Sequence, residues 1–297
     1  MKFVVIGGAG FIGSHLVNYL IEQNHSVTIV DNLHSGNLSN LNVVKSEIEF
    51  FENDIRDLSS LRKILKDSDG IFHEAALTVV QDSYVKEKEY YDVNVTGTDN
   101  ILKLAKEFGI RVVFASSSSV YGNPKKVPIP EDAERKPLNP YGMTKLEDEY
   151  LAEKYAKLGV EAIGLRYFNV YGEGQNEAYA GVITKFLKRI EKQDAPIIYG
   201  DGSQTRDFVY VGDVAKANLL AMKSNVKNSF INVGTGVGIS IKDLAYMIID
   251  SSGLKMKPIF KKALKGDVKE SRADITLSHK LLGWKAKVKL REWLEKR

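Results

Sequence analysis

The 297-residue sequence contains no cysteine, only seven prolines and no apolar run of the roughly 18–20 residues that a membrane-spanning helix needs. Without cysteine the chain forms no disulfide, no thiolate zinc site and no cysteine nucleophile. The absence also suits a reducing compartment, so we predict a cytoplasmic protein. Residues 1–12 are apolar, but glycines interrupt them and no cleavage-site pattern follows, so we predict no signal peptide.

What the chain does have is an average globular composition, with 43% hydrophobic and 27% charged residues, which argues against disorder, collagen and coiled coil. Its charge is uneven: residues 255–297 carry 14 Lys and Arg against 5 Asp and Glu, a net +9 that leaves −5 for the rest. A basic tail could meet nucleic acid, an anionic membrane or a phosphorylated small molecule, or be a solvated surface. It holds no helix-turn-helix, zinc-finger or RNA-binding signature, so we expect neither a nucleic-acid nor a membrane partner.

Short apolar runs alternate with helical periodicity through the first half of the chain. The predicted strands are 2–6, 26–30, 48–51, 70–73, 111–115 and 161–166, and the predicted helices are 14–23, 58–65, 86–108 and 141–158. Short buried strands separated by helices predict parallel crossovers. We therefore predict an α/β fold, with a doubly wound parallel Rossmann sheet over residues 1–170 and a smaller C-terminal α/β substrate-binding part over 171–297. We also expect some exchange of chain between the two.

Three glycines follow the first predicted strand at intervals of three residues. Gly7, Gly10 and Gly13 read G-x-x-G-x-x-G and lie where the first helix begins. Glycine there permits a tight turn and lets the backbone approach a pyrophosphate, while the helix N-terminus offers free N–H groups. A glycine triplet alone is weak evidence, but the order of strand, glycines and helix predicts a dinucleotide site.

Two aspartates follow the next two predicted strands. Asp31 stands 18 residues after Gly13, where a carboxylate can accept hydrogen bonds from both adenosine ribose hydroxyls and would repel a 2′-phosphate. We therefore predict NAD rather than NADP, with an ordinary surface turn as the alternative for Asp31. Asp54, followed by Ile55, is placed to reach the adenine amino group, although it can equally cap the helix predicted from Leu58.

The fourth predicted strand ends in the segment His73-Glu74-Ala75-Ala76. The small side chains of Ala75 and Ala76 leave room for a flat cofactor. A lone histidine such as His73 is more often structural than catalytic, so we assign it no role in the reaction.

Tyr141 and Lys145 stand four residues apart and share one face of a predicted helix. A tyrosine is a poor base at neutral pH because its reference pKa is about 10. A nearby ammonium and a positively charged nicotinamide would both favour the phenolate, and Lys145 could also hold the nicotinamide ribose. Ser117 ends the fifth strand in a run of four serines, where its hydroxyl could bridge the reacting oxygen and Tyr141. These three residues form the predicted proton-transfer site.

With these motifs the chain resembles the extended short-chain dehydrogenases/reductases, and among them the nucleotide-sugar epimerases and dehydratases. The matching segments extend over nearly the whole chain and are jointly specific for the group, but less so for one substrate. They are residues 7–13 (GGAGFIG), 54–57 (DIRD), 94–98 (NVTGT), 116–122 (SSSSVYG), 141–145 (YGMTK), 166–169 (RYFN), 200–211 (GDGSQTRDFVYV) and 282–284 (LGW).

The resemblance implies roles for further residues and a homodimer built from the helix that carries Tyr141 and the long helix before it. The resemblance assigns Arg206 to a phosphate, and the planar guanidinium of an arginine suits phosphate oxygens. The alternative for Arg206 is a salt bridge with Asp207 or another neighbour. Toward NAD, the resemblance adds Phe11, Ile12, Asn32, Asn94 and Phe168 to the residues above. Toward a UDP-sugar, it assigns Asn169 and Arg206 to the diphosphate, Val182 and Tyr199 to the uridine, and Asp267 to the nucleotide pocket.

The chain departs from its family's pattern at two places. Many relatives carry an arginine two residues before a Gly-Asp pair, where this chain has Leu264, and Lys262 or Lys265 could replace that phosphate contact. Some relatives place a lysine where this chain has Thr78.

The serine run indicates the reaction. By similarity, a 4,6-dehydratase would carry Asp-Glu at Ser118 and Ser119, and a UDP-glucuronate decarboxylase would carry Glu at Ser119. Without an acid, removal of the C5 proton or assisted decarboxylation lacks its catalyst. The resemblance therefore favours a UDP-hexose 4-epimerase, in which Tyr141 takes the C4 hydroxyl proton and a 4-keto sugar rotates before hydride returns. A UDP-glucuronate 4-epimerase, a net nucleotide-sugar reductase and an idle NAD-binding subunit are the alternatives, and the intact Ser117, Tyr141 and Lys145 argue against the last.

Family comparison also places Ser271 beside the C2 substituent of the sugar. Relatives with a bulky aromatic at this position are largely confined to plain hexoses, whereas small residues accompany acceptance of 2-acetamido sugars. Serine leaves that volume, so we predict that UDP-GlcNAc and UDP-GalNAc interconvert alongside UDP-Glc and UDP-Gal. The alternative is that Ser271 is a small strand or turn residue that points elsewhere.

Overall fold

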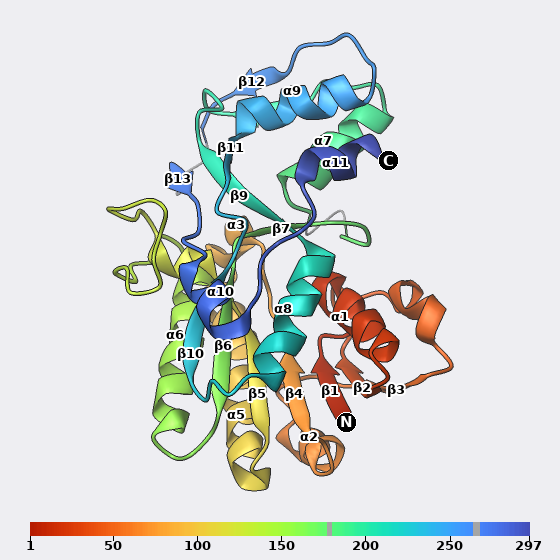
Figure 1. The fold of residues 1–297 in the computed structure, drawn as a ribbon, viewed down its shortest axis with the longest axis vertical. Helices are drawn as coiled ribbons and strands as arrows, with labels where there is room; N and C mark the ends of the chain where they lie inside the picture. The colour runs from red at the N-terminus through yellow and green to blue at the C-terminus, as the bar shows by residue number, and fades with distance from the viewer. Residues whose placement is uncertain (177–179, 264–267) are drawn as a thin grey trace.

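A parallel sheet of seven strands forms the centre of the larger lobe, in the lower half of Figure 1. The computed structural model describes residues 1–176, 180–263 and 268–297. The strand order of the seven-stranded sheet, β10-β6-β5-β4-β1-β2-β3, reverses direction beside β1, as in doubly wound sheets. The strands are β1 (Lys2–Ile6), β2 (Ser26–Asp31), β3 (Ile48–Glu52), β4 (Gly70–His73), β5 (Arg111–Ser117), β6 (Ala162–Tyr167) and β10 (Ser229–Val233).

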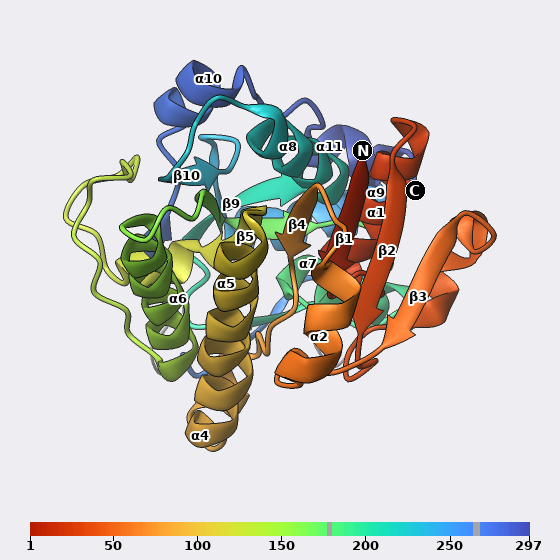
Figure 2. The same ribbon diagram turned by 90° about the horizontal axis from the view of Figure 1, so that it is seen from below.

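Helices cover both faces of this sheet, as the view in Figure 2 shows. One face carries α1 (Phe11–Glu22) and α8 (Val211–Lys223), and the other carries α2 (Leu58–Leu65), α5 (Gly97–Phe108) and α6 (Pro140–Ala156). A short helix, α10 (Thr276–Leu282), packs against α8 and β10. This arrangement confirms the predicted doubly wound parallel α/β fold.

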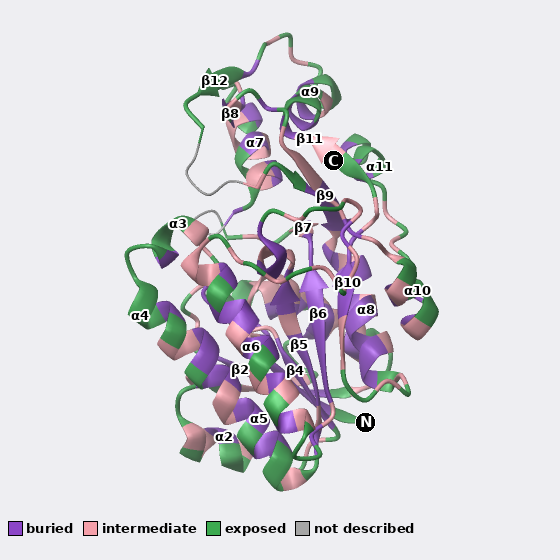
Figure 3. Ribbon diagram, turned by 90° about the vertical axis from the view of Figure 1, so that its left-hand side faces the viewer, coloured by how far each residue is buried: buried purple, intermediate pink, exposed green. Residues whose placement is uncertain are grey.

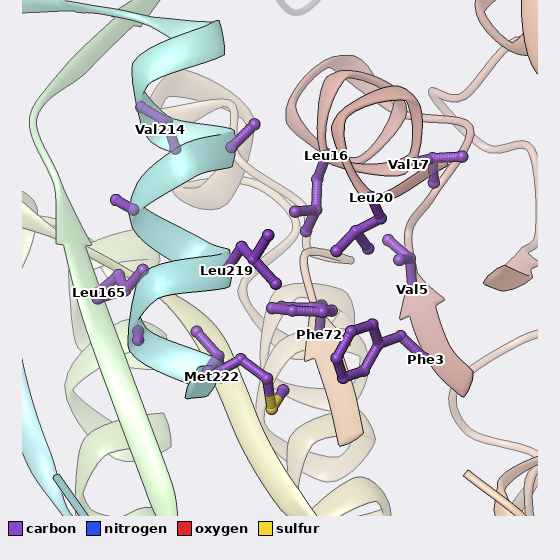
Figure 4. Close-up of a cluster of buried hydrophobic side chains, with 14 of the residues drawn as sticks. Phe3, Val5, Leu16, Val17, Leu20, Phe72, Leu165, Val214, Leu219 and Met222 are labelled. Carbon is purple, nitrogen blue, oxygen red and sulfur yellow. The ribbon is translucent and has the colours of Figure 1, made fainter. Parts of the chain in front are cut away.

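The apolar sequence of β1 follows from this double covering. Successive side chains of a strand point to opposite faces, so Phe3 and Val5 enter the core under α1 and α8, and Val4 and Ile6 enter the other core. Figure 4 shows the first core, in which the rings of Phe3 and Phe72 meet edge to face at 5.2 Å. Burying each such large side chain stabilises the fold by roughly 1.5–3 kcal/mol, which explains why no polar residue interrupts this strand.

The segment predicted as one helix over 86–108 is divided in the structure. It consists of α4 (Glu87–Tyr90), a π-helical segment η2 (Tyr91–Thr96) and α5, preceded by the single turn α3 (Val80–Ser83). Asn94 lies in η2 and is fully buried, with its amide bonded to Leu77 and to Thr144. Periodicity alone does not predict such a widened turn, which places a polar side chain toward the interior.

The smaller lobe lies at the carboxyl ends of the large sheet (Figure 1). Its four-stranded sheet has the order β11-β9-β13, with β7 also paired to β9, and β12 pairs separately with β8. The middle of β9 is buried, whereas β12 is exposed along its length, as Figure 3 shows for β12. The elements are β7 (Asn169–Tyr171), α7 (Val182–Glu191), β8 (Ile197–Tyr199), β9 (Thr205–Tyr210), β11 (Gly238–Ser240), α9 (Ile241–Ser251), β12 (Ile259–Lys261), β13 (Glu270–Ser271) and α11 (Leu290–Glu295).

The chain passes between the lobes more than once, because α8 and β10 return to the large sheet after β7, α7, β8 and β9 have been formed. The domain boundary at residue 170 stays a prediction. The described residues also form two 3-10 helices, η1 (Leu38–Val44) and η3 (Ser118–Tyr121). Of the helices in the described ranges, none combines the length and the apolar character needed to cross a membrane.

Candidate active site

The glycine turn between β1 and α1 is held close to the end of β4. Gly7 has a φ of +82°, and a Cβ on it would lie 2.6 Å from the backbone nitrogen of Ala75. A Cβ on Gly13 would collide with the carbonyl oxygen of Gly7. Gly10 is the N-cap of α1 and no side chain caps this helix, so the N–H groups of its first turn are available to an anion.

Asp31 is fixed at the end of β2, directly beside this turn. Its Oδ2 accepts a hydrogen bond from the Ala9 N–H at 2.9 Å, and its Oδ1 accepts one from the Leu33 N–H at 2.8 Å. The side chain is buried, and this burial raises the pKa of Asp31. Asp31 is therefore not an ordinary surface turn residue, because the backbone holds its carboxylate in one position.

A cavity of about 380 Å³, here named the glycine-turn cavity, opens beside these groups. Among the residues predicted to bind the cofactor, most line it: Gly7, Gly10, Phe11, Ile12, Gly13, Asp31, Asn32, Ile55, Ala75, Ala76 and Phe168. The other four predicted cofactor residues are not among the described residues that line this cavity: they are Tyr141 and Lys145, which lie on α6, and Asp54 and Asn94. Further lining residues that the sequence patterns did not indicate include His34, Asn53, Arg56 and Glu74.

Asp54 and Asn94 are both committed to contacts within the protein. Asp54 accepts hydrogen bonds from the guanidinium of Arg56 at 2.8 Å and from the Asn32 amide at 2.9 Å. Arg56 is the main cause that holds the pKa of Asp54 well below its usual range. The Asn94 amide donates to the Leu77 carbonyl at 3.0 Å and accepts from the Leu77 N–H at 2.8 Å, which ties the cavity wall after β4 to η2. Direct contact of either residue with a cofactor stays a prediction.

His73 occupies a structural position. Its ring is buried, and Nε2 lies 3.0 Å from the Thr98 hydroxyl. Burial lowers the pKa of His73 to about 3, so the ring is neutral at physiological pH. This agrees with the expectation from the sequence.

Ser117 lies at the carboxyl end of β5, where the strand turns into η3. Its hydroxyl donates to the Ser119 hydroxyl at 3.0 Å and accepts from the Ser119 N–H at 3.1 Å. Ser117 lines a second cavity of about 330 Å³, here named the serine cavity. Its other lining residues are Val80, Gln81, Ser118, Ser119, Gly122, Ile129, Asn139, Tyr167, Phe168, Asn169, Arg206, Val268 and Ser271.

Lys145 is fixed on the buried side of α6. Helix α6 begins with Pro140 and is capped by Asn139, whose side chain accepts from the Gly142 N–H at 2.8 Å. The Lys145 ammonium donates to the carbonyl of Ala115 at 3.0 Å. Burial lowers the pKa of Lys145, but the negative charges of Asp148, of Tyr141 when ionised and of Glu74 raise it by more. The lysine is therefore an ammonium at neutral pH, in electrostatic contact with Tyr141.

A third cavity, of about 490 Å³, lies along α7 and contains the predicted uridine residues Val182 and Tyr199. We name it the α7 cavity. Its cationic side, formed by Lys185, Lys188, Arg189 and Lys192, was not predicted. The signal was present in the sequence, because positions three, four and seven residues apart lie on one helix face.

Two residues connect the three cavities. Asn169 lines all of them, and Arg206 lines both the serine cavity and the α7 cavity. Arg206 does not pair with Asp207, because Asp207 accepts instead from the N–H groups of Thr235, Gly236 and Ala273. A salt bridge of Arg206 with another neighbour stays an alternative. A ligand can therefore extend from α7, past Arg206, to the serines at the end of β5.

Ser271 is paired with Arg206 across the parallel strands β13 and β9, is buried, and lines the serine cavity. Three other predicted or discussed positions, Leu264, Lys265 and Asp267, lie outside the described residues, and the replacement of an arginine by Lys262 or Lys265 stays a prediction.

The comparison with known proteins now decides the family. Residues 3–234 match the NAD dependent epimerase/dehydratase family. The chain belongs to this family. The match confirms the predicted family resemblance. It also confirms the predictions that the protein is an enzyme and that NAD is its cofactor. The glycine-turn cavity fits that cofactor, since it combines close backbone approach at Gly7, an open helix N-terminus and the fixed carboxylate of Asp31.

Solved structures of similar proteins cover the chain almost completely. A UDP-glucose 4-epimerase from Thermotoga maritima, solved with UDP-glucose, gives a TM-score of 0.95 at 37% identity over 99% of this chain and 96% of that chain. A UDP-N-acetylglucosamine 4-epimerase from Methanobrevibacter ruminantium, in complex with UDP-N-acetylmuramic acid, gives 0.93 at 38% identity over 99% and 96%. A UDP-glucuronic acid 4-epimerase from Bacillus cereus, in complex with UDP-glucuronic acid and NAD, gives 0.93 at 33% identity over 99% and 97%.

A carboxylate beside the glycine-turn cavity escaped the sequence reasoning. Glu74 accepts a hydrogen bond from the Tyr167 hydroxyl at 2.9 Å, and that hydroxyl accepts one from the Asn218 amide at 2.8 Å. Burial raises the pKa of Glu74 to about 8. No local signal could have shown this, because Tyr167 is 93 positions away in the sequence.

Proposed function

We propose that this member of the family is a UDP-hexose 4-epimerase, which interconverts UDP-Glc and UDP-Gal through a 4-keto intermediate. The observation that carries the proposal is the lining of the serine cavity. Among its described residues there are hydroxyls, amides and the guanidinium of Arg206, but no carboxylate. Abstraction of a C5 proton, as in dehydration, requires a general base, and these residues offer none.

The proposed chemistry uses three side chains at the ends of β5 and α6. Tyr141 accepts the proton of the C4 hydroxyl and later returns it, as general base and then general acid. Lys145 favours the phenolate by its positive charge, and Ser117 orients the reacting oxygen by a hydrogen bond. NAD, when bound, supplies reversible hydride transfer. Because the hydride returns to the sugar, the reaction needs no added reductant.

Binding of the UDP part is proposed in the α7 cavity. Val182 and Tyr199 line this cavity, which supports their assignment to uridine, and Arg206 and Asn169 line it too, which supports their assignment to the diphosphate. The lysines along α7, such as Lys185 and Lys192, add a positive potential that suits a diphosphate. A nucleotide anchored there leaves the sugar in the serine cavity, free to turn and present either face.

We further propose that the serine cavity admits 2-acetamido sugars. Ser271 is small, buried and part of the cavity lining, so it provides volume at one wall. Its hydroxyl can hydrogen-bond an acetamido group. UDP-GlcNAc and UDP-GalNAc are therefore expected to interconvert as well.

The competing substrate is UDP-glucuronate, and the similar Bacillus cereus enzyme bound to UDP-glucuronic acid keeps it in consideration. A sugar carboxylate in this cavity would need a cationic or strongly donating partner. Arg206 is the cation among the described residues that line the serine cavity, and it is the side chain that we propose to bind the diphosphate. A neutral hexose suits this lining better.

One experiment separates these possibilities. Purified protein with NAD and no reductant is incubated with UDP-Glc, UDP-Gal, UDP-GlcNAc, UDP-GalNAc and UDP-glucuronate, and the products are identified by proton NMR. We expect C4 epimers of the four neutral sugars. Turnover of UDP-glucuronate alone would establish the uronate epimerase instead, and a need for reductant would establish a net reductase.

The role of Ser271 is tested separately by Ser271→Tyr. Overpacking a snug pocket costs roughly 1–3 kcal/mol, so kcat/KM for the acetamido pair should fall about 5- to 150-fold more than for the plain pair. Ser271→Ala keeps the volume and serves as the control. Equal losses for both pairs in Ser271→Tyr would contradict the assignment.

We also propose a homodimer through α6 and α5, as the family resemblance implies. Light scattering of the purified protein tests it, and a monomer at micromolar concentration would contradict it.

A further inference from the structure

Lys145 has a buried partner that the proposed reaction does not use. Its ammonium donates to Oδ2 of Asp148 at 3.1 Å, in addition to the carbonyl of Ala115 at 3.0 Å. Two of the three N–H groups of the ammonium are therefore used within the protein. Asp148 stands three residues after Lys145, so both side chains project from the same side of α6.

Asp148 is completely buried within the protein. The residue has 0% exposure, and its Oδ1 has no hydrogen-bond partner among the described residues. The Thr98 hydroxyl, which also acts on Asp148, donates its own hydrogen to the Asn94 carbonyl at 2.6 Å. Lys145 is thus the principal group that compensates the charge of Asp148.

Few other charges act on this pair. Glu149 follows Asp148 on α6, and its charge opposes ionisation of Asp148. Helix α5 contributes the uncharged Thr98, and β4 contributes His73, which is neutral because it is buried. Glu74, after β4, and the phenolate of Tyr141 act on Lys145. Burial, the largest effect, raises the pKa of Asp148 to about 6, and the ammonium of Lys145 acts against it.

We infer that Asp148 is a positioning residue that holds the Lys145 ammonium on the buried side of α6 and reduces its attraction for the Tyr141 phenolate. This inference rests on the proposed function, in which Tyr141 and Lys145 transfer the proton. It adds a group that sets the pH range in which they act.

The direction of the effect follows from the charges. An ionised Asp148 offsets part of the positive charge that stabilises the phenolate. Removing the carboxylate leaves Lys145 unbalanced, so the phenolate forms at lower pH. The same change removes the main support of the buried ammonium, so Lys145 loses its proton at lower pH. Both limbs of a pH–activity profile should then move down together.

The test replaces the carboxylate by an amide of the same shape, Asp148→Asn. Ionisation of Tyr141 is measured by ultraviolet difference titration of the NAD-loaded protein, with the corresponding Tyr141→Phe protein subtracted because the chain has 14 tyrosines. We expect the midpoint of the titration to fall by about 0.5–1 pH unit, and the acid limb of kcat to fall by the same amount. The matched control is Glu147→Gln, which removes a partly exposed carboxylate from the same helix and should leave both midpoints unchanged.

An unchanged or raised midpoint in Asp148→Asn, with or without a lower kcat, would overturn the inference, because loss of packing alone reduces activity without moving the titration. Asp148→Ser replaces Asp148→Asn if the amide variant does not fold. The ultraviolet readout needs no substrate, so it remains decisive even if no UDP-sugar is turned over and the proposed function fails.

Discussion

Arg166 and Glu149 form a bidentate ion pair beside Ser116, the residue before Ser117. The Arg166 Nε and Nη2 atoms each lie 2.8 Å from one Glu149 oxygen, and both side chains are buried. Glu149 also accepts from the Ser116 hydroxyl at 2.6 Å and from Arg135 at 3.0 Å. Because these residues belong to β5, α6 and β6, the pair joins the strand that ends in Ser117 to the helix that carries Tyr141.

Breaking this pair should destabilise the fold strongly. Glu149→Gln leaves a buried guanidinium without its counter-charge, and we expect a loss of about 3–5 kcal/mol in the free energy of unfolding. Glu107→Gln, which breaks the exposed Arg62–Glu107 pair, is the control and should cost less than about 1 kcal/mol. Urea unfolding measures both, and equal costs would contradict the structural role given to Glu149.

Cofactor preference should depend on Asp31. The wild type is expected to bind NAD at least tenfold more tightly than NADP, since ~1.4 kcal/mol of repulsion between a phosphate and a carboxylate gives that factor. Asp31→Asn removes the charge and keeps an acceptor oxygen for one of the two N–H groups, of Ala9 and of Leu33, that Asp31 binds, so the ratio should fall. Asp67→Asn changes an exposed carboxylate and is the control. Equal affinities of the wild type for the two cofactors, measured by calorimetry, would remove Asp31 from this role.

Removing the Tyr141 hydroxyl should reduce turnover far more than it reduces cofactor binding. For Tyr141→Phe we expect kcat to fall by roughly 10²–10⁴-fold, the usual contribution of a general acid–base group, with nearly unchanged affinity for NAD. Lys145→Ala should weaken both turnover and NAD binding. Tyr150→Phe, on an exposed turn of the same helix, is the control. If Tyr141→Phe retained more than half of the wild-type rate, another base would have to operate.

Glu74 should make stability depend on pH. Its pKa is raised to about 8 by burial, from about 4.5 in the unfolded chain, so the native state holds a proton that the unfolded state has lost. The stability that neutral Glu74 contributes is present below pH about 4.5 and is lost as the pH rises to about 8. Glu74→Gln still accepts from Tyr167 but cannot ionise.

We therefore expect Glu74→Gln to match the wild type near pH 4.5 and to exceed it by about 1–3 kcal/mol above pH 8, in urea unfolding without cofactor. Glu87→Gln, which changes an exposed carboxylate, should show no such divergence. A constant difference between Glu74→Gln and the wild type at every pH would mean that folding does not raise the pKa of Glu74.

Most secondary structure could be predicted because its causes are local. The strands of the large sheet are short apolar runs, and the helices between them repeat their apolar residues at helical spacing. The π-helical segment at Tyr91–Thr96 was missed, because the contacts made inside it, from Asn94 to Leu77 and Thr144, join it to residues far away in the sequence.

The same distinction holds for the site. Gly7, Gly10 and Gly13 are close in sequence and act through backbone geometry, so their spacing alone predicts the turn. Lys145 and Asp148 are also close in sequence, yet nothing local shows that both are buried. Arg206 and Ser271 come together only because β9 and β13 pair, 65 positions apart, and that pairing places them on one wall of the serine cavity.

By itself, then, the sequence determined the doubly wound fold, the glycine turn with its aspartate, and the Tyr141–Lys145 pair, since each depends on residues within a few turns or one strand–helix unit. The tertiary structure alone decided that the three cavities meet at Asn169, that the serine cavity has no carboxylate among its described residues, and that Glu74 and Asp148 are enclosed. The burial of Glu74 and Asp148 depends on every element that packs over them, because those elements together determine how much water each side chain loses.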